Sequence, residues 1–354
     1  MKATEAHEYG KLFKEQRDGN GQILSSLSRK FKDLYEIAQE DCMAWLDQRT
    51  SNSIHAIVTD PPYGLKEYTA TEKHKLRNKH GGVWRIPPKL DGYERQPLPR
   101  FTVLTSTEKI ELKNFFAQWA HKAFRVLAPG GHVFIASNPL LSHLVAEALE
   151  CSGFEKRGEI IRLVQTLRGG DRPKNAHKEF SDVTVMPRSC WEPWGLFRKP
   201  CEGRVQDNLR KWKTGGLRRV SADQPFCDVI KSSPTRANER ELAPHPSLKP
   251  QAFMRQIVRA ALPLGEGIIL DPFMGGGSTI AAACALGYRS IGIEADAEFY
   301  RVAAEAIPRL AMLQIDNEKH TASERSPKVV KQEDLFIFSL QDCVLATHLF
   351  ESKI

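Results

Sequence analysis

The stretch GIILDPFMGGGST, residues 267–279, joins an apolar run, a turn with three consecutive glycines and the start of a helical segment. The run at 267–271 is short and apolar, which is typical of a buried strand in a parallel sheet. Residues 278–286 favour a helix. A glycine turn in this position lets a ligand approach the backbone, and the free N–H groups at the helix start favour an anionic group. The stretch therefore predicts a nucleotide pocket in an α/β protein.

A nicotinamide dinucleotide is the main alternative ligand for such a turn. Its Gly-x-Gly-x-x-Gly fingerprint, counted from Gly275, requires a glycine at position 280, where this chain has Ile280. The fingerprint is therefore incomplete. Glu294, at the end of the next predicted strand, is placed to accept both hydroxyls of a ribose.

Predicted strands and helices alternate on both sides of this stretch. Apolar periodicity predicts strands at 34–39, 54–59, 132–136, 160–165, 267–271 and 289–294. It predicts helices at 42–48, 108–127, 140–151, 250–262, 278–286 and from residue 297 onward. We expect residues 129–131 (PGG) to stop the second of these helices and Pro308 to kink the last. Such alternation implies a doubly wound, mostly parallel sheet.

The segment 166–244 breaks this alternation and carries much of the basic charge. The chain has a net charge of +8, and residues 152–249 contain 20 Lys and Arg against 12 Asp and Glu, so the remainder is balanced. Residues 64–100 hold a second local excess, with nine basic and four acidic side chains. Two basic regions on a balanced chain suggest a polyanionic partner, while a solvated basic surface would give the same composition.

The tetrapeptide Asp60-Pro61-Pro62-Tyr63 directly follows the predicted strand 54–59. Open α/β sheets bind ligands at the carboxyl ends of their strands. The turn offers a carboxylate, a carbonyl constrained by the next proline, and an aromatic ring. Two such acceptors can hold the exocyclic amine of a base with its lone pair directed at an electrophile, while Tyr63 stacks on the base. A rigid turn with a capping Asp is the structural alternative.

A third motif, HPSLKP at residues 245–250, precedes the helix predicted at 250–262. Together the three motifs resemble the DNA amino-methyltransferases that use S-adenosylmethionine, the family that methylates adenine N6 or cytosine N4. The resemblance covers about residues 34–306, and the motif order is similar to the permuted β class, which includes cell-cycle adenine methyltransferases and many restriction-modification enzymes. It implies a Rossmann-like methyltransferase fold with an inserted target-recognition region.

The resemblance also implies roles for individual residues. The catalytic set would be Asp60, Pro61, Pro62 and Tyr63. The set that binds S-adenosylmethionine would be Asp41, Ser247, Lys249, Asp271, Phe273, Gly275, Gly277, Ser278 and Glu294. In the family, the residues around the glycine turn line the methionine part, the acidic residue at 294 holds the ribose, and Ser247 and Lys249 lie near the carboxylate. Asp41 would meet the adenine, although Glu40 stands where the family usually has Gly.

The expected organisation has five parts. An N-terminal extension (1–30) precedes the catalytic half (31–165), which contains the basic loop 64–100. The target-recognition region (166–244) is followed by the cofactor-binding half (245–316) and a C-terminal tail (317–354), in which only residues 335–340 could order.

Other chemistries fit the sequence less well. His177-Lys178-Glu179 and Pro200-Cys201 partly match the zinc-deaminase signature, but Arg204 stands where the second cysteine ligand is needed. Cys201 could serve as the thiolate of a cytosine C5 methyltransferase, yet no neighbouring motif supports that role. The seven cysteines are scattered without a Cys-x-x-Cys pair, which is typical of reduced thiols. We expect neither a metal site nor a covalent route.

The sequence therefore predicts a site-specific methyltransferase that flips a base out of duplex DNA. Adenine N6 is the preferred target because Asp, rather than Ser, opens the tetrapeptide. Cytosine N4, an RNA target and a non-catalytic DNA-binding or specificity subunit stay open as alternatives. No apolar run approaches the length of a membrane helix, so we expect a cytoplasmic protein. A homodimer and a cognate restriction endonuclease are left open as partners.

Overall fold

The computed structural model describes residues 31, 33–62, 104–164, 170, 172–173 and 175–315, and the backbone of the short strands β3 (Lys89–Leu90) and β4 (Tyr93–Glu94). Tyr63, the extension 1–30, the tail 317–354 with its segment 335–340, and the rest of the basic loop lie outside the described residues. The chain divides into two units after Leu313, and all the elements below belong to the first. In the part described, no helix has the length and apolar character needed to cross a membrane.

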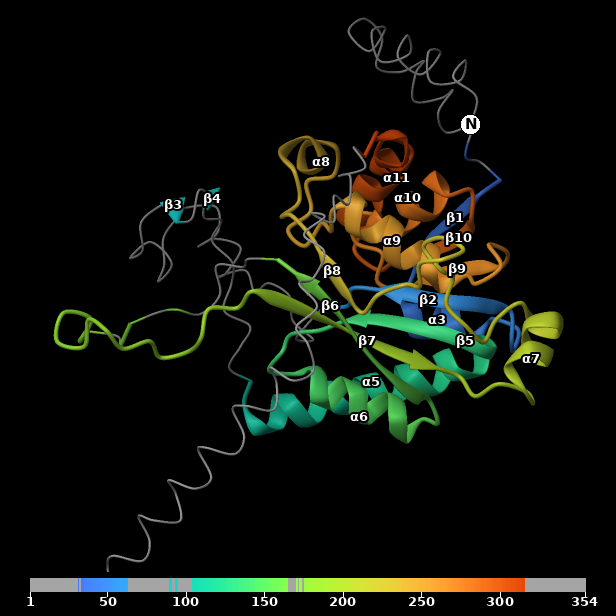
Figure 1. Cartoon of the computed structure of the whole chain (residues 1–354), viewed down its shortest axis with the longest axis horizontal. Coiled ribbons are helices and arrows are strands. Elements are labelled where there is room, and N and C mark those ends of the chain that lie inside the picture. The colour runs from blue at the N-terminus through green and yellow to red at the C-terminus, as the bar shows by residue number, and fades with distance from the viewer. Residues whose placement is uncertain are drawn as a thin grey trace, which may run out of the picture. The chain divides into compact units, whose positions relative to one another are not determined.

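The described core is built on one sheet of eight strands, in the order β1-β10-β9-β2-β5-β7-β6-β8 (Figure 1). Pairing is parallel throughout except on both sides of β7, which runs antiparallel to β5 and to β6. The strands are β1 (Tyr35–Gln39), β2 (Ile54–Thr59), β5 (Leu127–Ala136), β6 (Glu155–Leu163), β7 (Trp191–Arg198), β8 (Val229–Lys231), β9 (Ile268–Asp271) and β10 (Arg289–Glu294). The predicted mostly parallel α/β sheet is confirmed.

Helices cover both faces of this sheet, as Figure 1 shows for α5 and α6 on one side and α9 and α10 on the other. The helices are α3 (Cys42–Asp47), α5 (Ser106–Val126), α6 (Ser142–Cys151), α7 (Val205–Trp212), α8 (Ala237–Leu242), α9 (Gln251–Ala261), α10 (Ser278–Ala285) and α11 (Ala297–Met312). The central strand β2 explains this layering, because Ile57 packs into the α5 and α6 cluster while Ala56 and Val58 pack into the α9 cluster. Apolar side chains on both faces make β2 a buried strand.

Two expected boundaries are wrong. The expected stop at residues 129–131 lies inside β5, which begins at Leu127 rather than at 132. Gly130 has a φ of +75°, and a Cβ there would lie 2.4 Å from Asn208 Nδ2, so the glycine is needed for a close approach of α7 to the strand. β6 also begins five residues earlier than predicted, because its first half pairs with β7.

The irregular segment 166–244 is partly built into the sheet. It supplies β7, between β5 and β6, and β8, at the edge, together with α7 and α8. α7 carries Val205, Leu209 and Trp212 at helical spacing, but β7 contains Pro193 and Gly195 and has no clear apolar alternation. Pairing on both sides compensates for this weak local pattern.

Candidate active site

The predicted site residues converge on the edge of the sheet where the parallel strands end. Asp60 follows β2, Asp271 ends β9 and Glu294 ends β10. β7 runs in the opposite direction, so its first residues reach the same edge. The carboxyl edge of an open α/β sheet is where ligands bind.

A hydrogen bond joins the ends of β2 and β9. Thr59 Oγ1 donates to Asp271 Oδ1 over 2.7 Å, and the same oxygen accepts the N–H of Phe273 over 3.2 Å. The pKa of Asp271 is raised to about 6, chiefly by burial and with a smaller contribution from the nearby Asp60 carboxylate, against hydrogen bonds from Thr279, Thr59 and Phe273 that lower it. The Asp60 turn and the glycine turn are therefore within electrostatic reach of each other.

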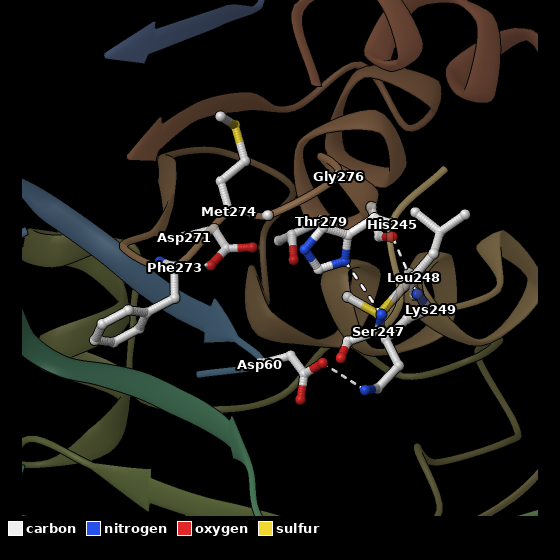
Figure 2. Close-up of a pocket in the computed structure, with 13 residues that line it drawn as sticks. Asp60, His245, Ser247, Leu248, Lys249, Asp271, Phe273, Met274, Gly276 and Thr279 are labelled. Carbon is white, nitrogen blue, oxygen red and sulfur yellow. Dashed lines mark hydrogen bonds and ion pairs between the residues drawn. The ribbon is translucent and has the colours of Figure 1, made fainter. Parts of the chain in front are cut away.

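One pocket is lined by residues of all three motifs (Figure 2). The lining residues are Asp60, His245, Ser247, Leu248, Lys249, Met254, Asp271, Phe273, Met274, Gly275, Gly276, Ser278 and Thr279. Seven of the predicted site residues are among them. The tetrapeptide and the glycine turn thus share a cleft, as the sequence interpretation requires.

The glycine turn is held open by its backbone conformation and by Glu294. Gly275 and Gly277 have φ values of +51° and +83°, a region that favours glycine. The N–H of Gly275 donates to Glu294 Oε2 and that of Asp296 to Oε1, each over 2.8 Å. Burial raises the pKa of Glu294 in spite of these bonds.

His245 packs directly against the glycine turn and forms one wall of the pocket. A Cβ on Gly276 would lie 2.9 Å from His245 Cβ, so the glycine permits this close contact. The His245 ring packs edge-on against Phe299 at a centroid distance of 4.3 Å, and its Nδ1 accepts the N–H of Ser247 over 3.2 Å. Burial and the Lys249 ammonium lower the pKa of His245 to about 4, so the ring is neutral near pH 7.

Lys249 lies beside two carboxylates of the chain itself. Its Nζ donates to Asp60 Oδ2, and it lies 3.7 Å from Glu192 Oε1. Its backbone N–H donates to Ser278 Oγ over 3.2 Å, which ties the HPSLKP segment to the start of α10. The ammonium therefore lies at the Asp60 turn rather than reaching only toward the glycine turn.

The remaining predicted residues do not line the pocket, and Tyr63 lies outside the described part. Asp41 is the N-cap of α3, where its Oδ1 accepts the N–H groups of Met43 and Ala44. It lies close to Glu294, since the Glu40 N–H donates to the Glu294 carbonyl over 3.1 Å. Pro61 is buried and Pro62 half-buried beside Asp60. Gly277 and Glu294 support the turn from behind the lining residues.

Some residues at the site were not predicted. His245 belongs to a motif that was recognised, so its position in the sequence could have indicated it. Met254 and Thr279 lie on helices whose starts were predicted, but their orientation toward the pocket depends on helix packing. Glu192 had no sequence signal, because the strand that carries it was not predicted.

The comparison with known families decides the family. The N6/N4 family described as DNA methylase matches residues 54–305, which is most of the chain. The chain belongs to this DNA methylase family. The family and the enzyme class predicted from the three motifs are thereby confirmed.

Three individual proteins illustrate what this chain is similar to. The type II methyltransferase M.HindIII of Haemophilus influenzae is 27% identical over 294 residues, which cover 77% of this chain and 94% of the relative. The solved PvuII DNA methyltransferase, described as cytosine-N4-specific, is 14% identical with a TM-score of 0.51 over 80% of this chain and 88% of its own. That likeness supports the fold alone. A solved complex of M1.HpyAVI with S-adenosylmethionine (SAM) is 19% identical, with a TM-score of 0.49 over 77% of this chain and 99% of its own.

Proposed function

We propose that this DNA methylase transfers a methyl group from S-adenosylmethionine to the N6 amine of an adenine flipped out of duplex DNA. The observation that carries the proposal is the single pocket lined both by Asp60 and by the glycine turn at Gly275 and Gly276. A donor held at the turn and an amine held at Asp60 would then be neighbours, as direct transfer requires.

The residues around the turn fit S-adenosylmethionine. Gly275 and Gly276 make room for the His245 wall of the pocket, and Glu294 offers a carboxylate beside the turn for ribose hydroxyls. Phe273 and Met274 supply apolar surface, and Ser247 and Ser278 supply hydroxyls at the other wall. When bound, the sulfonium supplies an electrophilic methyl group together with its own leaving group.

Asp60 orients the attacking nitrogen. The amine of adenine is a weak nucleophile because its lone pair is delocalised into the ring. The Asp60 carboxylate and the Pro61 carbonyl each accept one N–H, so that the lone pair points at the methyl carbon and the developing positive charge is stabilised. The new N–C bond forms as the S–C bond breaks. The alkylated nitrogen is then acidic, and Asp60 takes its proton.

Basic residues of the segment 166–244 provide phosphate contacts. Arg204 and Arg210 expose about three quarters of their side chains, but both pair with Asp207, and α7 packs against Gly130 near the start of β5, so neither is assigned such a contact. Arg218 donates to the Tyr288 hydroxyl and serves the protein interior. Flipping is needed because the target amine is paired inside the duplex.

We also propose a cellular setting for this chain. The type II name of M.HindIII supports a place for this chain in a restriction-modification system with a cognate endonuclease. We propose that the protein is cytoplasmic and forms a homodimer. Size measurement in solution tests the dimer directly.

Mass analysis of digested duplex DNA, after incubation with the protein and S-adenosylmethionine, tests the proposal. We expect N6-methyladenine without N4-methylcytosine. N4-methylcytosine alone would move the target to cytosine and overturn the choice of base. Methylation of structured RNA in preference to duplex DNA at raised salt would overturn the choice of nucleic acid.

A further inference from the structure

A row of alternating charges runs from the pocket into the sheet. It begins with Asp60 after β2, continues through Lys249 and Glu192, and ends at Arg162 on β6. The side chains are 16%, 9%, 16% and 6% exposed, in the same order. Burying such a row costs desolvation free energy, so packing alone does not explain its arrangement.

Lys249 stands between two carboxylates. Its Nζ donates to Asp60 Oδ2, as the dashed line in Figure 2 shows, and lies 3.7 Å from Glu192 Oε1. A lysine ammonium is a compact charge on a flexible stem, and one carboxylate alone would leave it free to swing. Glu192 supplies the second contact that fixes its position.

Glu192 is itself held at both oxygens. Oε1 accepts the indole N–H of Trp194 over 2.8 Å, and Oε2 accepts Arg162 Nη1 over 3.2 Å. The Trp194 indole is fully buried and packs against Phe253 at a centroid distance of 5.4 Å. Glu192 therefore presents its carboxylate to Lys249 from a rigid part of the core.

Arg162 is fixed by the segment after β8. Its Nε donates to Ser232 Oγ over 3.0 Å and its Nη2 to the Ser233 carbonyl over 3.1 Å. Its guanidinium also lies over the Phe253 ring, 5.2 Å from the centroid. Arg162 thus anchors its end of the row to the segment 166–244, which also supplies Glu192, while the other end of the row is Asp60.

We propose that Glu192 and Arg162 are positioning residues for methyl transfer, which act through Lys249 on the Asp60 carboxylate. The inference rests on the proposed role of Asp60. Arg162 orients Glu192, Glu192 holds the Lys249 ammonium, and the ammonium fixes the oxygen of Asp60 that it binds. The other oxygen of Asp60 is thereby aimed at the amine of the target base. An amine misplaced by about 1 Å can cost about 10²-fold in rate, so this control of position matters to turnover.

β6 and β7 are also joined by a second ion pair, which provides a control for the test. At their other end, Glu155 on β6 pairs with Arg198 on β7 over 2.6 Å, and the residues are direct cross-strand neighbours just as Arg162 and Glu192 are. Among the described residues, Arg198 has one further acceptor, the Gly215 carbonyl, over 3.1 Å. Glu155→Gln therefore removes a cross-strand ion pair that is more exposed than the one at Glu192, and in the described part of the chain this pair has no link to Asp60.

The test compares Glu192→Gln with Glu155→Gln in steady-state methylation of duplex DNA. We expect Glu192→Gln to lower kcat by about 10- to 100-fold with little change in KM for DNA or for S-adenosylmethionine, because positioning and not binding is lost. Glu155→Gln should leave kcat within about two-fold of wild type. Equal kcat values for the two variants, or a loss confined to KM, would overturn the proposal.

A double-variant cycle tests whether the effect passes through Lys249. In a Lys249→Met background, Glu192→Gln should change kcat by less than about two-fold, since the group it positions is already absent. A full loss in that background would show an independent role and overturn the proposal.

Should Glu192→Gln fail to fold, Glu192→Asp serves in its place, because it keeps the charge and withdraws the carboxylate from Lys249. We expect a kcat loss of about 10-fold for it, and an unchanged kcat would overturn the proposal. Wild-type protein that methylates no base would instead contradict the proposed function, which keeps the two failures distinguishable.

Discussion

Two partly buried lysines at opposite ends of the sheet are held by different chemistry. Lys199, just after β7, donates to Asn52 Oδ1 and to the carbonyls of Phe124 and Leu127, each over 2.8 Å. These acceptors are neutral, and burial lowers the Lys199 pKa. Lys249, at the carboxyl end, lies instead between the carboxylates of Asp60 and Glu192.

This difference suggests that Lys199 stabilises the fold, whereas Lys249 contributes to the site. Lys199 binds acceptors near the amino ends of β2 and β5, and these acceptors belong to residues that do not line the pocket. Lys249 and Asp60 both line the pocket. A charge pair at such a position can act on a ligand.

The largest effect that we expect follows from removal of each lysine. Lys249→Met leaves two carboxylates facing each other with no cation between them, so the free energy of unfolding should fall by about 3 kcal/mol. Adding Asp60→Asn to that variant should restore part of the loss, because it removes a stranded charge. Urea unfolding measures both steps.

Lys199→Met provides the comparison. Its partners are neutral, so adding Asn52→Ala should bring no recovery. If Asp60→Asn also fails to restore stability in the Lys249→Met variant, then charged partners do not distinguish Lys249 from Lys199, and the comparison of the two lysines is wrong.

A smaller effect concerns pH and the buried carboxyl of Asp271. Its pKa is raised from 3.8 to about 6, so the folded chain keeps the proton where the unfolded chain has lost it. The contribution to stability is fully present below about pH 4 and is lost as the pH rises through about 6. A shift of about two pKa units corresponds to about 3 kcal/mol.

Asp271→Asn isolates this contribution, because the amide does not titrate and its oxygen can still accept from Thr59. The free energy of unfolding of the variant, relative to wild type, should rise between about pH 4 and pH 7. Chemical unfolding of both proteins at several pH values measures this difference. Taking the difference in free energy of unfolding removes the contributions of the other titrating groups, which the two proteins share. A constant difference across this range would contradict the raised pKa.

The sequence was most informative where local pattern and chemistry coincide. The apolar run of β2 ends at Thr59 as predicted, so Asp60 falls at the carboxyl edge of the sheet. The glycine turn follows β9 for the same reason. Since parallel strands end at one edge, the two motifs could be placed in one pocket before any coordinates were known.

The rest depends on contacts between distant segments. β7 contains Trp, Pro and Gly without alternation, and it becomes a strand because β5 and β6 pair with it on either side. Lys249 and Asp60 are 189 residues apart, and their contact is set by how α9 docks on the sheet. Glu192 could not be assigned from sequence, because its role depends on both of these long-range arrangements.

We propose that the Asp60 carboxylate orients the amine during methyl transfer. The decisive measurement uses the Asp60→Ala variant with both ligands saturating, and follows single-turnover transfer of a labelled methyl group from S-adenosylmethionine to duplex DNA. We expect intact DNA binding and a transfer rate lower by about 10²- to 10³-fold. A rate within about three-fold of wild type, with binding preserved, would contradict it.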